Sequence, residues 1–190
     1  LNTFHTMPIC ASITKGYTNA CAGIKVGAKQ LFLGNWSTFA NQITLDADRE
    51  ITDLPVATLF RVEGLRNSMG VTENPEINLD LATIRFVQNA TVKVGDIDAD
   101  KHLEILGKYA KTKLVVFVQL ASDKIICFGR ENGCYISQAN ASSGVTNGDL
   151  NGYDLIFTAE EPNQSPFCTA FTTEPFDNYP DITVTPDFNS

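Results

Sequence analysis

KLVVFVQL, at residues 113–120, is a strongly apolar run that is too short to cross a membrane as a helix. Its length and its three valines are typical of a strand that is buried on both faces. A second run, Tyr153–Glu161, alternates between apolar and more polar residues. Because successive side chains of a strand point to opposite faces, this alternation predicts a strand that is covered on one side.

Two further β-rich runs, Ile125–Phe128 and Cys134–Ser137, lie between these segments. The short connection between them ends in Asn132-Gly133, and both of these residues tolerate the positive φ of a tight turn. This pattern predicts a β-hairpin that joins the two runs. A glycine-rich loop at 142–152 then leads into the last strand.

The segments KLVVFV, CFGRENGCYIS and SGVTNGDLNGYDLIFTAEEP resemble the C-terminal half of tail-tube-type structural proteins of tailed phages, in particular those of Bacteroidetes phages and prophages. The resemblance covers Glu76–Pro162, with a weaker similarity in the cysteine-containing N-terminal segment, and GDLNGY is its most specific part. It implies a β-sandwich with one helix, and copies that form rings, usually hexameric, which stack into a conduit for DNA. It implies no enzyme activity and no cofactor.

Composition favours one domain with its own core, because the chain has 190 residues and 43% of them are apolar. Its 14 basic residues are scattered and are outnumbered by 22 acidic ones, which argues against a protein that grips nucleic acid. An acidic surface is compatible with DNA that passes without binding, but charge alone favours simple solubility as its role. The sequence shows no secretory signal and no run long enough for a membrane helix, so we expect no membrane contact.

Residue types that carry chemistry are sparse. The chain has two histidines and lacks the phosphate-binding loop, the dinucleotide fingerprint and the nucleophile elbow. The five cysteines match no zinc pattern, and we expect Cys127 and Cys134 to be small apolar strand residues, with a bridge between them or between Cys10 and Cys21 as the alternatives. We therefore expect no catalytic residue, no metal and no cofactor, and a carbohydrate-active enzyme is the least favoured alternative.

The N-terminal half predicts short strands at 30–33 and Pro55–Glu63. Asn41–Asp53 predicts two short strands that are joined by a charged, solvated turn. Trp36 is expected to anchor packing with its indole N–H bonded.

Gly64–Asn74 contains two glycines and few packing residues, which predicts a long mobile loop. By the resemblance, tube proteins carry at this place a loop that reaches the next ring, and Met69 and Val71 would be exposed for that contact. The candidate ring-stacking residues are Asn67, Met69, Val71 and Glu73.

Glu76–Gly95 is a strand pattern in which the apolar phase changes near Leu81-Ala82. Such a change indicates a bulge or a switch of the buried face. A strand pair that leaves the sandwich to join the sheets of neighbouring subunits would need this change, and so would a strand that bends at a sandwich corner. The candidate intersubunit residues are Ile77, Leu79, Leu81, Ile84 and Phe86.

Asp96–Ala110 predicts one amphipathic helix with Asp98 as its N-cap. The expected buried stripe consists of Ala99, Leu103, Leu106 and Ala110, widened by Ile105 and Tyr109, and His102 lies off it. After Pro162 the prolines are expected to exclude regular structure. Regularly spaced aromatic residues there predict an arm that lies across its own or a neighbouring subunit.

The sequence therefore predicts a mainly β protein: an antiparallel β-sandwich or barrel with one amphipathic helix at 1–161, and an extended arm rich in proline and aromatic residues at 162–190. The function implied by the resemblance is that of a tail tube subunit in the virion, assembled in the host cytoplasm. Its expected partners are copies of itself in stacked, hexameric rings, other tail or virion proteins, and passing DNA. The alternative is another virion β-sandwich, such as a capsid decoration protein or a receptor-binding, adhesive module.

Overall fold

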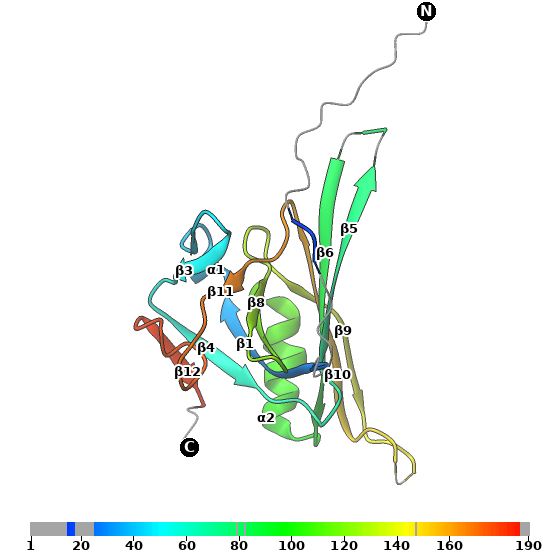
Figure 1. Cartoon of the computed structure of the whole chain (residues 1–190). Helices are drawn as coiled ribbons and strands as arrows, with labels where there is room; N and C mark the ends of the chain where they lie inside the picture. The colour runs from blue at the N-terminus through cyan, green and yellow to red at the C-terminus, as the bar shows by residue number, and fades with distance from the viewer. Residues whose placement is uncertain (1–14, 18–24, 79, 82, 147, 187–190) are drawn as a thin grey trace, which may run out of the picture.

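The computed structural model describes residues 15–17, 25–78, 80–81, 83–146 and 148–186. The protein is mainly β, with 48% strand and 10% helix, and its strands form two sheets (Figure 1). The predicted fold class, a β-sandwich with one short helical segment, is confirmed.

The larger sheet, sheet A, has eight strands in the order β12-β4-β1-β7-β8-β11-β3-β2. These strands are β1 (Ala28–Asn35), β2 (Thr44–Leu45), β3 (Glu50–Asp53), β4 (Ala57–Val62), β7 (Leu114–Leu120), β8 (Ile125–Phe128), β11 (Phe167–Cys168) and β12 (Ile182–Thr185). Strand β7 is buried from Leu114 to Gln119, so the prediction of a strand buried on both faces is confirmed. Its alternate residues enter two different cores, one on each side of sheet A.

The smaller sheet, sheet B, has four strands in the order β5-β6-β10-β9. These strands are β5 (Gly70–Asn78), β6 (Thr83–Gly95), β9 (Tyr135–Ser142) and β10 (Gly152–Glu161). The predicted one-sided burial of the last strand is confirmed, because four alternate residues of β10 have no exposed surface. They are Tyr153, Leu155, Phe157 and Ala159.

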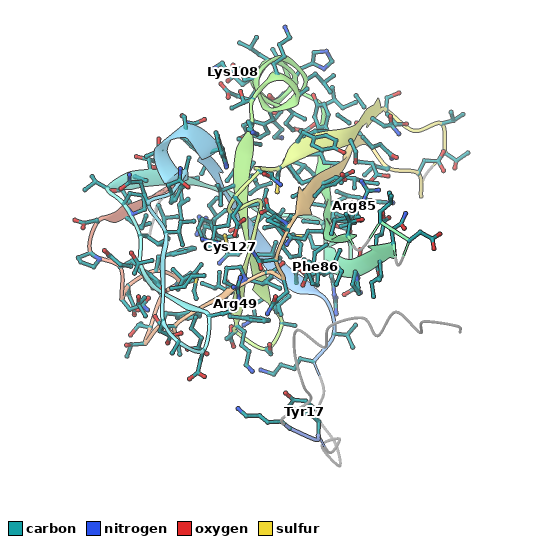
Figure 2. All side chains as sticks on the ribbon, turned by 90° about the horizontal axis from the view of Figure 1, so that it is seen from above. Tyr17, Arg49, Arg85, Phe86, Lys108 and Cys127 are labelled. Atoms are coloured by element: carbon teal, nitrogen blue, oxygen red, sulfur yellow. The ribbon has the colours of Figure 1, made fainter. Side chains whose placement is uncertain are left out.

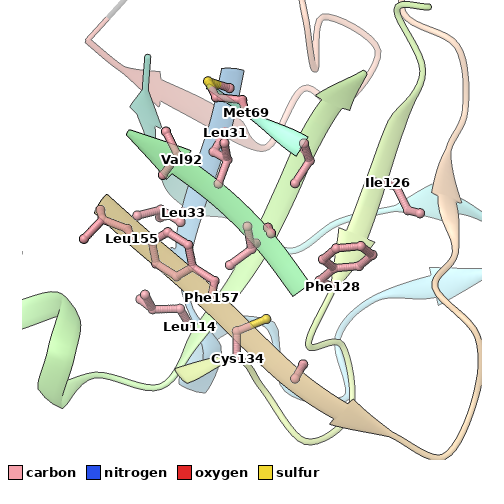
Figure 3. Packing of buried hydrophobic residues seen from close by; sticks show 14 of the residues in the cluster. Leu31, Leu33, Met69, Val92, Leu114, Ile126, Phe128, Cys134, Leu155 and Phe157 are labelled. Carbon is pink, nitrogen blue, oxygen red and sulfur yellow. The ribbon is translucent and has the colours of Figure 1, made fainter. Parts of the chain in front are cut away.

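The first core fills the space between the two sheets (Figure 3). Leu31 and Leu33 of β1 meet Leu155 and Phe157 of β10 there, and Val92 of β6 lies beside them. Each fully buried side chain of this size contributes about 1.5–3 kcal/mol to stability. Because one face of sheet B packs on this core, the opposite face of sheet B points away from the protein.

The second core lies on the opposite side of sheet A and is closed by the short helix α1 (Trp36–Phe39) and by the C-terminal segment. Phe176 packs edge-on against Phe32 and Phe117, with ring centroids 4.9 and 5.4 Å apart. The Tyr179 hydroxyl donates a hydrogen bond to the carbonyl of Ile51 at 2.5 Å.

Regular structure occurs within the proline-rich C-terminal segment, so the expectation that its prolines exclude strands was wrong. Strand β12 pairs in parallel with β4, and β11 pairs with β3 and β8. The prolines flank these short strands instead of interrupting them. The described part of the segment therefore lies across its own subunit, one of the two predicted positions, and the division at residue 161 stays a prediction.

The predicted hairpin between Ile125–Phe128 and Cys134–Ser137 was wrong. Strand β8 pairs with β7 in sheet A, whereas β9 pairs with β10 in sheet B. The connection at 129–133 therefore crosses between sheets, and the positive φ angles belong to Gly129 and Gly133 rather than to Asn132. The sequence signal identified a tight turn correctly but not the strands that pair across it.

Of the alternatives for Glu76–Gly95, a single strand with a bulge or bend was wrong, and a pair of strands is present. The chain reverses there, and β5 pairs with β6 along their length, from Gly70↔Thr91 to Asn78↔Thr83. The change of apolar phase near Leu81 therefore marks the turn of a hairpin, at which two strands meet.

The helical segment begins as predicted, because the Asp98 carboxylate accepts the backbone N–H of Lys101 at 2.8 Å. It consists of α2 (Ala99–His102), a π-helical segment η1 (Leu103–Lys108) and a final 3₁₀ turn η2 (Tyr109–Lys111). Ile105 is buried against the first core, whereas Leu103 is 60% exposed. The predicted stripe was therefore wrong at Ala99, Leu103 and Ala110, which are exposed. From Leu103 to Lys108 the wider π winding departs from the spacing of an α-helix on which the prediction rested.

The charged turn in the N-terminal half is confirmed, since Asp46 accepts the backbone N–H groups of Asp48 and Glu50 between β2 and β3. The expectation for Trp36 was wrong in one respect. Its ring packs on the second core and lies 3.9 Å from the Lys113 ammonium, but within the described part of the chain its buried indole N–H has no hydrogen-bond partner.

Replacing Gly152 with alanine is expected to destabilise the protein strongly. Gly152 has φ of +153°, and a Cβ there would lie 2.0 Å from the Val94 carbonyl oxygen on the neighbouring strand. The strained backbone alone costs about 1–3 kcal/mol, and the clash adds to it. Chemical denaturation measures the loss, with Gly148→Ala as the matched control because nothing lies within 4 Å of a Cβ at that position. Equal stability of the two variants would contradict this account of the GDLNGY segment.

Candidate subunit interface

The hairpin formed by β5 and β6 projects beyond the sandwich (Figure 1). Near its end Ile77 pairs directly with Ile84, and Pro75 pairs with Phe86. Because directly opposed residues of an antiparallel pair lie on the same face, Ile77, Ile84 and Phe86 share one side of the hairpin. That side is continuous with the face on which Ala90 and Val92 enter the first core.

The end of the hairpin exposes large apolar side chains. Ile77 is 59% exposed, Ile84 is 55% exposed, and Leu81 at the turn is 71% exposed. Further along the same face, Ala90 and Val92 have no exposed surface, because sheet A covers them. The hairpin therefore carries the core-facing side of sheet B past the point where sheet A covers it. Grouped exposed apolar residues of this kind mark interaction surfaces.

Charged residues occupy the other face of the hairpin. Arg85, which lies beside Phe86 on the hairpin (Figure 2), makes hydrogen-bonded ion pairs. Its partners are Glu76 on β5 and Glu160 on β10, at 2.6 and 2.7 Å. The hydrogen bond to Glu76, followed by attraction to Glu160, raises the pKa of the Arg85 guanidinium. These contacts connect three neighbouring strands across the surface of sheet B.

The intersubunit residues that the sequence suggested are largely brought together. Ile77, Leu81, Ile84 and Phe86 all lie on this hairpin, with Leu81 in its turn. Leu79 lies outside the described residues.

The candidate ring-stacking residues are arranged differently from the prediction. The expected long loop at 64–74 is a short turn followed by strand β5, which begins at Gly70. Asn67 is exposed at that turn, but Met69 is buried, and its sulfur accepts the backbone N–H of Gly64 at 3.1 Å. Val71 is partly buried against the first core. The expectation that Met69 and Val71 are exposed in a loop was therefore wrong, and the role of these residues in ring stacking stays a prediction.

Glu73 takes part in a network of hydrogen bonds within the subunit. Its carboxylate accepts the backbone N–H and the hydroxyl of Ser165, both at 2.8 Å, and the amide of Gln88 at 3.1 Å. The buried Gln88 in turn accepts the backbone N–H of Gly129. This network joins the base of the hairpin to the segment before β11 and to the turn at 129–133, so the projecting end starts from a rigid base.

The turn at 129–133 is held by a buried carboxylate at the end of β10. Glu161 is 3% exposed and accepts the backbone N–H groups of Glu131 and Asn132 at 3.0 and 2.9 Å. Burial raises the pKa of the Glu161 carboxyl, although these two hydrogen bonds oppose the shift. The group is fully used in holding this turn, so it is a structural carboxylate.

The two sheets end in four edge strands: β5 and β9 of sheet B, and β12 and β2 of sheet A. Proteins usually protect an exposed edge with charges, proline or very short strands. Strand β2 has two residues and β12 has four, while β5 carries Glu73, Pro75 and Glu76. Strand β9 has eight residues, YISQANAS, without charge or proline. This edge was not predicted, although the uncharged run is visible in the sequence.

The face of sheet B that points away from the core is mostly polar, with Ile156 and the half-exposed Tyr135 as exceptions. Asp154 of β10 lies between Lys93 of β6 and Asn140 of β9, and the next such row places Ile156 between Thr91 and Gln138. Thr158 and Asn89 share a hydrogen bond of 2.7 Å in the row after that. A row of mixed charges and neutral polar groups gives this face no strong attraction for anions.

Groups suited to catalysis are not assembled in the described residues. His102 is exposed and lies 3.4 Å from the Tyr153 hydroxyl. The thiols of Cys127, Cys134 and Cys168 are free and buried, and burial raises the pKa of all three, to about 12 for Cys168. Cys10 and Cys21 lie outside the described residues.

The described residues also contain neither a cluster of metal ligands nor a membrane-spanning helix. No group of three or more His, Cys, Asp or Glu side chains is placed to hold a metal ion there. Among the described helices, none is long and apolar enough to cross a membrane. The features that stand out are therefore an apolar hairpin end and an unprotected sheet edge.

No protein-family model, curated protein or solved structure matches this chain.

Proposed function

We propose that this protein is a virion structural protein, a subunit of a phage tail tube. Copies associate side by side into a closed ring, and the rings stack into a conduit for DNA. The proposal rests on the sequence resemblance, and the observation that carries it furthest is that both edges of sheet B, β5 and β9, have no partner strand among the described residues of the subunit.

Ring closure through these edges satisfies the unpaired backbone groups of both strands. Strand β9 of one copy pairs with β5 of its neighbour, and repetition of this heterologous contact closes a ring when the rotation between neighbours allows it. Strand β9 is suited to this role because it carries no charge and no proline, and the first part of β5, at 70–72, is also free of both. Closure makes the sheet B segments of all copies into one continuous barrel.

The polar face of sheet B then lines the channel. Its mixture of Lys93, Asp154 and neutral polar side chains offers DNA few sites to bind, and the net charge of −8 for the whole chain adds a weak repulsion. Passage of DNA requires such a surface, since a basic lining would hold the phosphates.

Electron microscopy of the purified protein tests this function. Rings or tubes with an open centre support the proposal. Small closed oligomers without a channel would instead favour a capsid decoration protein or a receptor-binding module.

Two lysines on the β9 edge are expected to abolish ring formation. In the variant Gln138→Lys/Asn140→Lys both new charges lie on the solvent face of the edge strand, where they oppose pairing with another strand. The monomer should keep its thermal stability, because both side chains lie at the edge of the sheet. The matched control is Thr183→Lys/Thr185→Lys, which places two lysines on exposed positions of the sheet A edge β12. Rings that persist in the β9 variant, or disappear in the β12 variant, would contradict the assignment of β9.

A further inference from the structure

The turn at 129–133, which leads from β8 of sheet A to β9 of sheet B, is held differently at its ends and in its middle. At its start, the backbone N–H of Gly129 donates to the side-chain oxygen of the buried Gln88 at 3.1 Å. At its end, Cys134 and Leu114 exchange two backbone hydrogen bonds of 2.6 and 2.9 Å. All of these bonds join uncharged amide groups, so both ends of the turn are held independently of pH.

The middle of the turn depends on a carboxylate. The backbone N–H groups of Glu131 and Asn132 donate to the two carboxylate oxygens of Glu161, at 3.0 and 2.9 Å. The Asn132 side chain bonds elsewhere, to the Glu160 carbonyl at 2.7 Å. The Glu131 side chain accepts the Asn163 amide at 3.2 Å. These side-chain bonds leave the two backbone N–H groups dependent on Glu161.

Glu161 lies where water has little access, because it is 3% exposed. The charged residues that line the same small hollow are Arg130 and Glu131, which form an ion pair with each other. The thiols of Cys127 and Cys134 also face Glu161, and burial raises the pKa of both, so they are uncharged at neutral pH. The other residues that line the hollow are Gln88, Asn163, Gln164 and Pro166.

A buried carboxylate that faces a second carboxylate takes up a proton more readily than an exposed one. Burial raises the pKa of the Glu161 carboxyl above its ordinary value of 4.5, and the charge of Glu131 adds to this effect. The hydrogen bonds from the turn oppose the shift without cancelling it. Once protonated, the carboxyl group carries a donor on one oxygen, so it no longer matches the two N–H groups that the carboxylate accepts.

We infer that Glu161 is a pH-sensitive switch: when its carboxylate takes a proton from the solvent, the middle of the turn at 129–133 is released while both ends stay in place. The turn precedes β9, which begins at Tyr135, so mild acid loosens the entry to this edge strand without unfolding the protein. The inference goes beyond the proposed function and does not depend on it.

The same proton changes the free energy of unfolding in a defined direction. Because the folded-state pKa of Glu161 lies above 4.5, its contribution to stability is complete below that pH and is lost as pH rises through the folded-state pKa. The variant Glu161→Gln has no proton to lose there. The stability of the unmodified chain relative to this variant should therefore decrease from about pH 4.5 to neutral pH, as measured by urea denaturation. A relative stability that increases over this range would overturn the switch.

Nuclear magnetic resonance titration of the full chain follows the turn directly. The amide signals of Glu131 and Asn132 should move together with one midpoint above pH 4.5, in the direction expected for N–H groups that lose a hydrogen bond. The amide signals of Gly129 and Cys134 should not follow this titration, because their partners do not titrate. Glu161→Gln should abolish the shared titration.

Glu160→Gln is the matched control, because Glu160 is the neighbouring residue but is exposed and pairs with Arg85. This control should leave the titration unchanged. Glu131→Gln should move the midpoint to lower pH, since it removes the negative charge that faces Glu161. This second variant tests the switch even if Glu161→Gln fails to fold. The switch is overturned by amide signals that do not titrate, by a midpoint at or below pH 4.5, or by a titration that persists in Glu161→Gln or disappears in Glu160→Gln.

Discussion

Replacing Phe176 with alanine is expected to lower the free energy of unfolding by about 3–5 kcal/mol, the usual cost of removing a fully packed phenylalanine. Phe176 is 3% exposed, and its ring lies edge-on between Phe32 of β1 and Phe117 of β7. Alanine keeps the Cβ, so the positive φ of +70° at this position is strained equally in both proteins. The loss therefore reports packing, and urea denaturation measures it.

Phe167→Ala is the matched control for this substitution. Phe167 lies in the same C-terminal segment but is 36% exposed, so its removal should cost about 1 kcal/mol or less. A double-mutant cycle between Phe176 and Phe117 should show coupling, because their rings are in contact. If Phe176→Ala were no more destabilising than Phe167→Ala, the C-terminal segment would not be part of the second core.

The double substitution Ile77→Ser/Ile84→Ser is expected to abolish assembly while leaving the subunit folded. Both isoleucines are more than half exposed in the subunit, so the change in unfolding free energy should stay within about 1 kcal/mol. In the assembly they would be buried by a neighbouring copy, and two such side chains at the centre of a contact carry much of its binding energy. Analytical ultracentrifugation measures the shift from large species to monomer.

Val56→Ser is the control for the isoleucine pair. Val56 is 77% exposed and precedes β4 on sheet A, away from the hairpin. The substitution removes an exposed apolar side chain without changing the β9 edge or the end of the hairpin, so assembly should continue. Assembly that survives the double substitution would show that the exposed isoleucines are not an interface.

Local pattern predicted the individual strands better than it predicted their partners. The apolar run at 113–120 and the alternation at 153–161 specify burial on two faces and on one face, and both were correct because side-chain period and composition are local properties. The turn at Asn132-Gly133 was also recognised. Its strands nevertheless enter different sheets, because pairing depends on which surfaces the cores bring together.

The candidate interface shows the same division. The sequence placed four described residues of the apolar hairpin in one set, since their change of phase is visible in the chain. It did not show that Met69 is buried, that Glu73 bonds to Ser165, or that β9 is an open edge. Each of these facts depends on a residue far away in the chain.

By itself, the sequence determined that this protein is built mainly of strands, where most of them lie, and that Asp98 begins its helix. The tertiary structure decided which strands share a sheet, that the C-terminal segment completes the second core, and which apolar side chains stay exposed at the hairpin end. The physical reason is the separation along the chain over which each effect acts. Backbone preference and side-chain alternation act between neighbours in the chain, whereas strand pairing and burial are set by contacts between distant segments.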